Sequence, residues 1–158
     1  MATPSSASTP SRTTHTLNEL IAATRDGQAF YEEAAEQVED RELGALFTRI
    51  ARVKAHIVEH LGTAVASAGG EPEADGTLFT GSMRMLYGKL RSTLGDKQYG
   101  FVAELEESED RLAKAFADVV GDESIPLPAR EVAQRLLPEV SACHDVMRNR
   151  KQAMEQAA

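Results

Sequence analysis

The chain has 158 residues, of which 42 % are hydrophobic and 27 % charged, and this predicts one domain with a buried core. The net charge of −8 argues against nucleic acid as a partner, because phosphate binding needs clustered Lys and Arg, and it disfavours an anionic membrane surface. No apolar run approaches the ~18 residues of a membrane span. The amino terminus lacks the regions of a secretory signal, and one cysteine cannot form an internal disulfide, so we expect a cytoplasmic protein.

The first half of the chain predicts a tail followed by two helices. Residues 1–14 are rich in Ser, Thr and Pro, which predicts a disordered tail before a helical domain over residues 15–156. Thr16 and Glu19 match the capping box that starts a helix, and apolar residues then recur every three or four positions as far as the break at residues 40–42. A second helix follows to about Ser67, where two glycines and a proline end it.

The second half predicts two more long helices. One begins near Asp96 and runs to about Val120; the other begins at Pro128 and runs to about Gln156, with a kink at Pro138. The connections between the four helices differ in length. Two are short, whereas the middle one has about 25 residues and contains a short extra helix over residues 77–93. We therefore predict an all-α, antiparallel four-helix bundle with the long crossover of ferritin-like proteins.

Several stretches carry a resemblance to a family, and it covers about residues 16–152. They are Leu20-Ile21 with Asp26-Gly27, Phe30 to Glu36, Leu46-Phe47, Gly69 to Pro72, Gly76 with Met85 to Leu90, Glu106 to Phe116, and His144-Asp145. Their order and spacing resemble uncharacterised bacterial ferritin-like, rubrerythrin-related four-helix-bundle domains. In that family the di-iron ligand set is generally eroded, so the resemblance implies the fold without a complete metal centre.

The di-iron pattern of such bundles can be placed on this sequence. It takes one Glu from each of two helices and a Glu-x-x-His from each of the other two. In the first half these positions hold Thr24, Lys54 and Ile57, none of which is a ligand of that pattern. The positions in the second half hold Glu109, Ser141 and His144. Two of six ligands thus remain, one Glu and one His.

Two interpretations of Glu109 and His144 stay open. They form either a buried pair hydrogen-bonded across helices, with Lys54 as compensating charge, or a residual metal site completed by water or Glu32. Carboxylate and imidazole together suit Zn, Fe or Mn.

A second candidate site is the His pair of residues 56–60. His56 and His60 flank a Glu in the order H-x-x-E-H, which is the inverted zinc-peptidase signature. The helical stripe places both outside the core, and a chain this short has little room for a peptidase chamber. A solvated face is the simpler interpretation, and an exposed pair can also hold Zn²⁺, Ni²⁺ or Cu²⁺ or bridge two chains.

The remaining candidates favour a structural role. Cys143 faces the predicted core, which favours a packing residue. Four acids of the third helix are predicted to face solvent: Glu104, Glu106, Glu107 and Asp110. The crossover holds Met83, Met85 and Tyr87, which are either core residues or an apolar patch suited to a homodimer. We expect a non-catalytic, stress-related or partner-binding helical protein without a cofactor; the alternative is a metal-binding protein that uses one of the two candidate sites.

Overall fold

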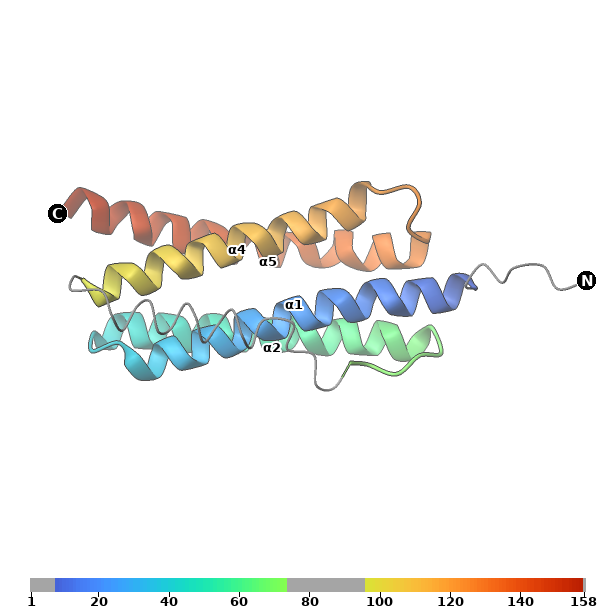
Figure 1. The fold of residues 1–158 in the computed structure, drawn as a ribbon, viewed down its shortest axis with the longest axis horizontal. Helices are drawn as coiled ribbons and strands as arrows, with labels where there is room; N and C mark the ends of the chain where they lie inside the picture. Colours follow the sequence, from blue (N-terminus) through green and yellow to red (C-terminus); the bar gives the residue numbers. More distant parts are fainter. Residues whose placement is uncertain (1–7, 74–95, 158) are drawn as a thin grey trace, which may run out of the picture.

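The computed structural model describes residues 8–73 and 96–157, which form four long helices (Figure 1). The helices are α1 (Thr9–Gln37), α2 (Arg41–Ser67), α4 (Lys97–Gly121) and α5 (Leu127–Ala157). No strand occurs within these described ranges. The predicted all-α four-helix bundle is therefore confirmed, whereas the predicted extra helix over residues 77–93 lies outside the described residues.

The start of α1 differs from the prediction. The helix begins at Thr9, with the Ser8 hydroxyl accepting a hydrogen bond from the Ser11 amide, so the predicted start at Thr16 is wrong and residues 9–14 are helical. Tertiary contacts explain the difference: the Thr13 side chain is buried, and the Arg12 guanidinium donates to the Ser124 carbonyl of the α4–α5 loop. Such contacts stabilise a helical turn that local composition alone disfavours.

The other helix ends follow from local chemistry that the sequence displays. Asp40 accepts from the Leu43 amide at 3.0 Å and caps α2, and Asp96 caps α4 in the same way. Gly69 has a φ of 83°, the left-handed conformation that ends α2, as the two glycines predicted. Helix α5 continues through Pro138 and covers the whole predicted range, with one further residue at each end.

The helices form two antiparallel hairpins, α1–α2 and α4–α5, whose contacts are more extensive within each hairpin than between them. Helices α2 and α4 run in the same direction, because each begins at the end of the bundle where α1 and α5 finish (Figure 1). The connection from Ser67 to Lys97 therefore joins opposite ends of the bundle. This topology has the long middle crossover that was predicted.

The core consists of two apolar clusters, one toward each end of the bundle. One cluster includes Leu17, Leu61 and Phe116, and the other includes Phe47 and Met147. Buried polar side chains lie along the helices between these clusters, among them Thr24, Lys54 and Glu109. This buried polar layer is the first candidate for a functional site.

Candidate functional site

An ion pair occupies the middle of the bundle. Lys54 Nζ on α2 lies 2.7 Å from Glu109 Oε1 on α4, and the two side chains are 1 % and 0 % exposed. Taking two charges out of water costs several kcal/mol per ion, and only their mutual attraction offsets this cost. The middle of the bundle thus contains a solvent-excluded ion pair whose two charges cancel.

The neighbouring residues shape the space around the Lys54 stem. Gly27 on α1 faces it, since a Cβ added at Gly27 would lie 3.2 Å from Lys54 Cδ. The ammonium lies 5.6 Å from the centre of the Tyr31 ring, which adds a cation–π attraction, and Tyr31 packs edge-on against Phe47. On α1, the missing side chain of Gly27 thus leaves space for the methylene groups of Lys54, and the Tyr31 ring attracts its ammonium group.

The polar atoms of this layer are incompletely hydrogen-bonded. Among the described residues, no hydrogen bond of normal geometry reaches Lys54 Nζ, either oxygen of Glu109, or the Tyr31 hydroxyl. Burial raises the pKa of the Tyr31 hydroxyl well above its ordinary value, and the nearby Glu109 charge raises it further. The close contact between the Lys54 and Glu109 charges is therefore the main polar interaction that this layer displays.

On three helices, the residues at the positions of the di-iron pattern face the core. Thr24, Lys54, Ile57 and Glu109 are all buried, as their positions in the di-iron pattern require. The buried Thr24 hydroxyl needs no partner on another helix, because it donates a hydrogen bond to the Leu20 carbonyl of its own helix at 2.7 Å. The proposed compensation of Glu109 by Lys54 is also confirmed.

The predicted register is wrong on α5. The inward side chains there are Val140 and Cys143, whereas Ser141 and His144 lie one residue, or about 100°, around the helix. His144 faces the α4–α5 seam instead of Glu109. The reason is the apolar stripe of α5, which runs through Leu136, Val140, Cys143 and Met147 and sets the inward face.

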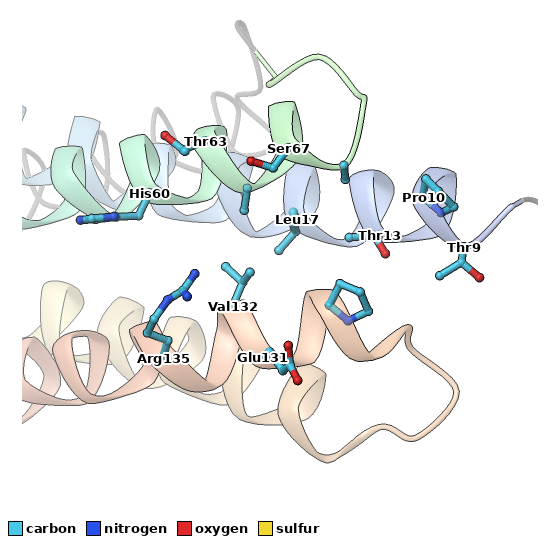
Figure 2. A pocket seen from close by; sticks show the side chains of 13 residues that line it. Thr9, Pro10, Thr13, Leu17, His60, Thr63, Ser67, Glu131, Val132 and Arg135 are labelled. Atoms are coloured by element: carbon cyan, nitrogen blue, oxygen red, sulfur yellow. The ribbon is translucent and has the colours of Figure 1, made fainter.

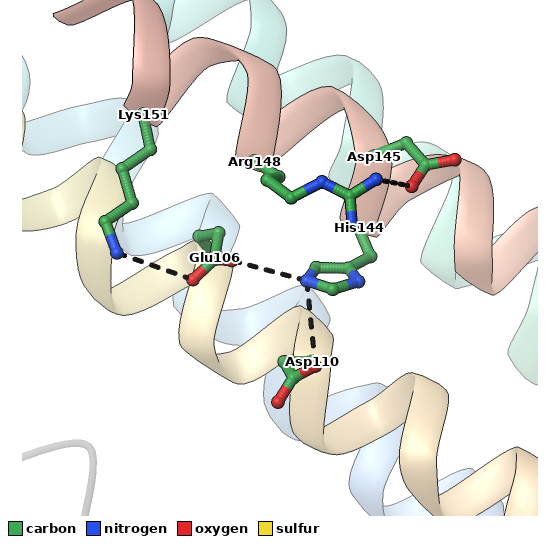
Figure 3. Close-up of polar contacts among 6 residues, drawn as sticks. All are labelled: Glu106, Asp110, His144, Asp145, Arg148 and Lys151. Atoms are coloured by element: carbon green, nitrogen blue, oxygen red, sulfur yellow. Dashed lines mark hydrogen bonds and ion pairs between the residues drawn. The ribbon is translucent and has the colours of Figure 1, made fainter. Parts of the chain in front are cut away.

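His144 belongs to a separate polar cluster at the α4–α5 seam (Figure 3). Its Nε2 lies 3.3 Å from Glu106 Oε1 and 3.8 Å from Asp110 Oδ1, and Lys151 approaches the other Glu106 oxygen at 3.9 Å. The predicted Glu109–His144 pair is thus replaced by two pairs, Lys54–Glu109 and His144–Glu106. Glu106, predicted to face solvent, has only 17 % of its side chain exposed.

The described residues contain no group of three or more His, Cys, Asp or Glu side chains that could hold a metal ion. Glu32, considered as a third ligand, is exposed and accepts a hydrogen bond from Gln28. Cys143 is buried as predicted, and burial raises the pKa of its thiol to about 11, which suits a packing residue.

The outward position predicted for His56 and His60 is confirmed, since both side chains are exposed. His56 lies 3.6 Å from Glu59 on the same helix. His60 instead lines a cavity of about 490 Å³ between α1, α2 and α5, with Arg135 on its other side (Figure 2). Thr13 also lines this cavity and carries a buried hydroxyl without a hydrogen-bond partner in the described chain. No sequence motif indicated this cavity, because its residues come from three helices.

The sequence matches the family described as "Domain of unknown function (DUF2383)" over residues 12–122. The chain belongs to this family. The DUF2383 match contains α2 and α4 with Lys54 and Glu109, and it ends just after α4, before α5 begins. No curated protein and no solved structure matches the chain. None of the described helices of this DUF2383 protein is both long and apolar enough to cross a membrane.

Proposed function

We propose that this DUF2383 protein is a non-catalytic, ferritin-like helical bundle that acts by binding a partner. The observation that carries the proposal is the Lys54–Glu109 pair, buried at 1 % and 0 % exposure. A bundle that holds two metal ions in its core needs negative ligands there. In this chain an ammonium group stands at one ligand position and neutralises the carboxylate at another.

The electrostatics of this pair oppose metal binding at the same place. A divalent cation would have to share the interior with the Lys54 charge or displace it from Glu109, and either change leaves a buried charge uncompensated. The other inward positions offer Thr24, Ile57 and Val140, which are not ligands, and Cys143, whose pKa of about 11 disfavours the thiolate that binds metal. The chemistry of the side chains thus supports a structural interior.

The topology supports the ferritin-like relationship. Two antiparallel hairpins with α2 and α4 in the same direction need one long connection, which is the arrangement of ferritin-like bundles. The six positions of the metal pattern are all buried when Val140 and Cys143 are taken as the positions on α5. The alternative function, a residual metal site made by Glu109 and His144, loses support because each residue has a different partner.

Elemental analysis tests the proposal. Untagged protein from iron-supplemented cells should contain well under one transition-metal ion per chain, and it should not accelerate aerobic oxidation of Fe²⁺ over buffer. A His144→Ala variant should behave in the same way, because His144 does not face the core. Two stoichiometric irons per chain with oxygen-dependent oxidation of Fe²⁺ would contradict the proposal, and one ion per chain lost in His144→Ala would favour the alternative.

A further inference from the structure

The outer face of the α1–α2 hairpin is hollowed over the part next to the turn that joins the two helices. Two adjacent hollows, of about 590 and 470 Å³, lie between the helices and share Ala35, Thr48 and Arg52 in their linings. We call them together the hairpin groove. Small side chains line much of it, namely Ala35, Gly44, Ala45, Thr48, Ala51 and Ala55. Small residues let another backbone approach closely, but they do not by themselves define a partner.

Charges flank the hairpin groove in a segregated pattern. An acidic edge consists of Glu32 and Glu36 on α1 and Glu39 in the turn that follows, and a basic edge on α2 consists of Arg41, Arg49 and Arg52. All six side chains are exposed. The remaining charged lining residue, Asp40, is engaged as the cap of α2.

The two edges do not neutralise each other within the chain. Among the described residues, no ion pair joins the acidic edge to the basic edge, although α1 and α2 lie side by side; Glu32 instead accepts a hydrogen bond from Gln28 of its own helix. Each edge therefore presents charge of one sign beside a groove of small residues. Complementary potentials of this kind set the register and orientation of an association.

We propose that the hairpin groove is the contact surface for a second copy of this chain, related by a twofold axis parallel to the helices. This inference rests on the proposed function, since it names the partner of a protein that acts by binding. A twofold contact uses the same patch on both subunits, so the patch must complement itself. An acidic edge beside a basic edge meets this condition.

The charges select one of the two possible face-to-face arrangements. With the axis parallel to the helices, each α1 faces the α2 of the partner subunit at the same level of the hairpin, so acid meets base. With the axis across the helices, α1 faces α1 and like charges meet, which is destabilising.

The levels within the hairpin also agree with the first arrangement. A Cβ added at Gly44 would lie 3.6 Å from the Ala35 carbonyl oxygen, so residues 35 and 44 are level. Counting outward along the two antiparallel helices puts Glu39 near the level of Arg41, and Glu32 near that of Arg49. The parallel axis keeps these levels, so Glu32 and Glu39 of one chain lie opposite the levels of Arg49 and Arg41 of the other.

Light scattering after gel filtration tests the proposal over a range of micromolar concentrations. The wild-type chain should give twice the chain mass of 17.1 kDa, and the dimer should dissociate more readily at high salt. The variants Glu32→Lys/Glu36→Lys and Arg49→Glu/Arg52→Glu should each be monomeric, because each one puts like charges at both contacts. An equimolar mixture of the two should recover a heterodimer, since both contacts then join opposite charges.

A matched control keeps the test specific. Asp118→Lys/Glu131→Lys makes the same change of charge at exposed positions of α4 and α5, and it should remain dimeric. Circular dichroism should report unchanged helicity in every variant. A monomeric wild type overturns the proposal, as does a dimer that survives both reversals, which would place the contact on another surface. Neither result would change the metal content, so failure of this proposal is distinguishable from failure of the proposed function.

Discussion

Replacing Lys54 with Met leaves the Glu109 carboxylate buried without its counter-charge. Breaking a buried ion pair in this way typically costs about 3–5 kcal/mol, whereas replacing both partners with apolar residues is often neutral or stabilising. We therefore expect Lys54→Met to lower the free energy of unfolding by about 3–5 kcal/mol and Lys54→Met/Glu109→Met to recover most of the loss. Urea denaturation followed by circular dichroism measures both. The exposed Lys114→Met is the control and should change stability by under about 0.5 kcal/mol.

If Lys54→Met were as stable as the wild type, the two charges would not be coupled in the interior. A double variant no more stable than Lys54→Met would instead show that packing around the lysine stem, beside Gly27 and Tyr31, dominates the energetics of this layer.

Asp26 gives the protein an unusual dependence on pH. Its carboxyl group is buried on α1 with no hydrogen-bond partner in the described chain, and this burial raises its pKa from 3.8 to about 6. The folded state thus holds the proton more tightly than the unfolded state. Its contribution to stability is full below about pH 4, falls as the pH rises toward 6, and above that is lower by about 1–3 kcal/mol.

We accordingly expect Asp26→Asn to be more stable than the wild type at pH 7.5, and to lose this advantage at pH 4. Melting temperatures measured at both pH values test this. Asp118→Asn, at an exposed position of α4, should show no such difference between the two values. An equal effect of Asp26→Asn at pH 4 and pH 7.5 would mean that the carboxyl group does not titrate differently on folding.

A ferritin-like interpretation depends on which face of α5 points into the bundle. If Val140 and Cys143 are its inward positions, a complete ligand set can be restored in a variant that keeps Glu109. The substitutions are Thr24→Glu, Lys54→Glu, Ile57→His, Val140→Glu and Cys143→His. We expect this variant to bind two Co²⁺ ions per chain, detected by visible absorption, and to gain helicity with the metal because metal binding and folding are coupled.

The control uses the register that the sequence predicted. It keeps the first three substitutions and adds Ser141→Glu, which leaves His144 as the imidazole. Since these side chains point toward the α4–α5 seam, this variant should bind Co²⁺ less tightly or not at all. Tighter binding by the Ser141→Glu variant would show that the orientation of α5 described above is incorrect.

At the scale of the molecule, the sequence predicts the four helices and the inward faces of three of them. The three- and four-residue spacing on α1 and α4 predicts that Thr24 and Glu109 face the core, and the di-iron pattern predicts the same of Lys54; all three are buried. On α5 it could not separate Cys143 from His144, because adjacent residues both border the apolar stripe. The start of α1 at Thr9 could not be predicted from the local sequence either, because it depends on contacts of Arg12 and Thr13 with distant parts of the chain.

The parallel course of α2 and α4 makes this chain equivalent to a pair of helical hairpins tethered by one long connection, residues 68–96. Contacts within each hairpin join residues near in sequence, whereas the contacts between hairpins join residues far apart. Folding therefore resembles an intramolecular docking reaction. Closing a tether of this length costs about 3 kcal/mol of chain entropy. The charged layer of Lys54 and Glu109 lies across that docking surface, with one partner from each hairpin, so it forms only when the two halves meet.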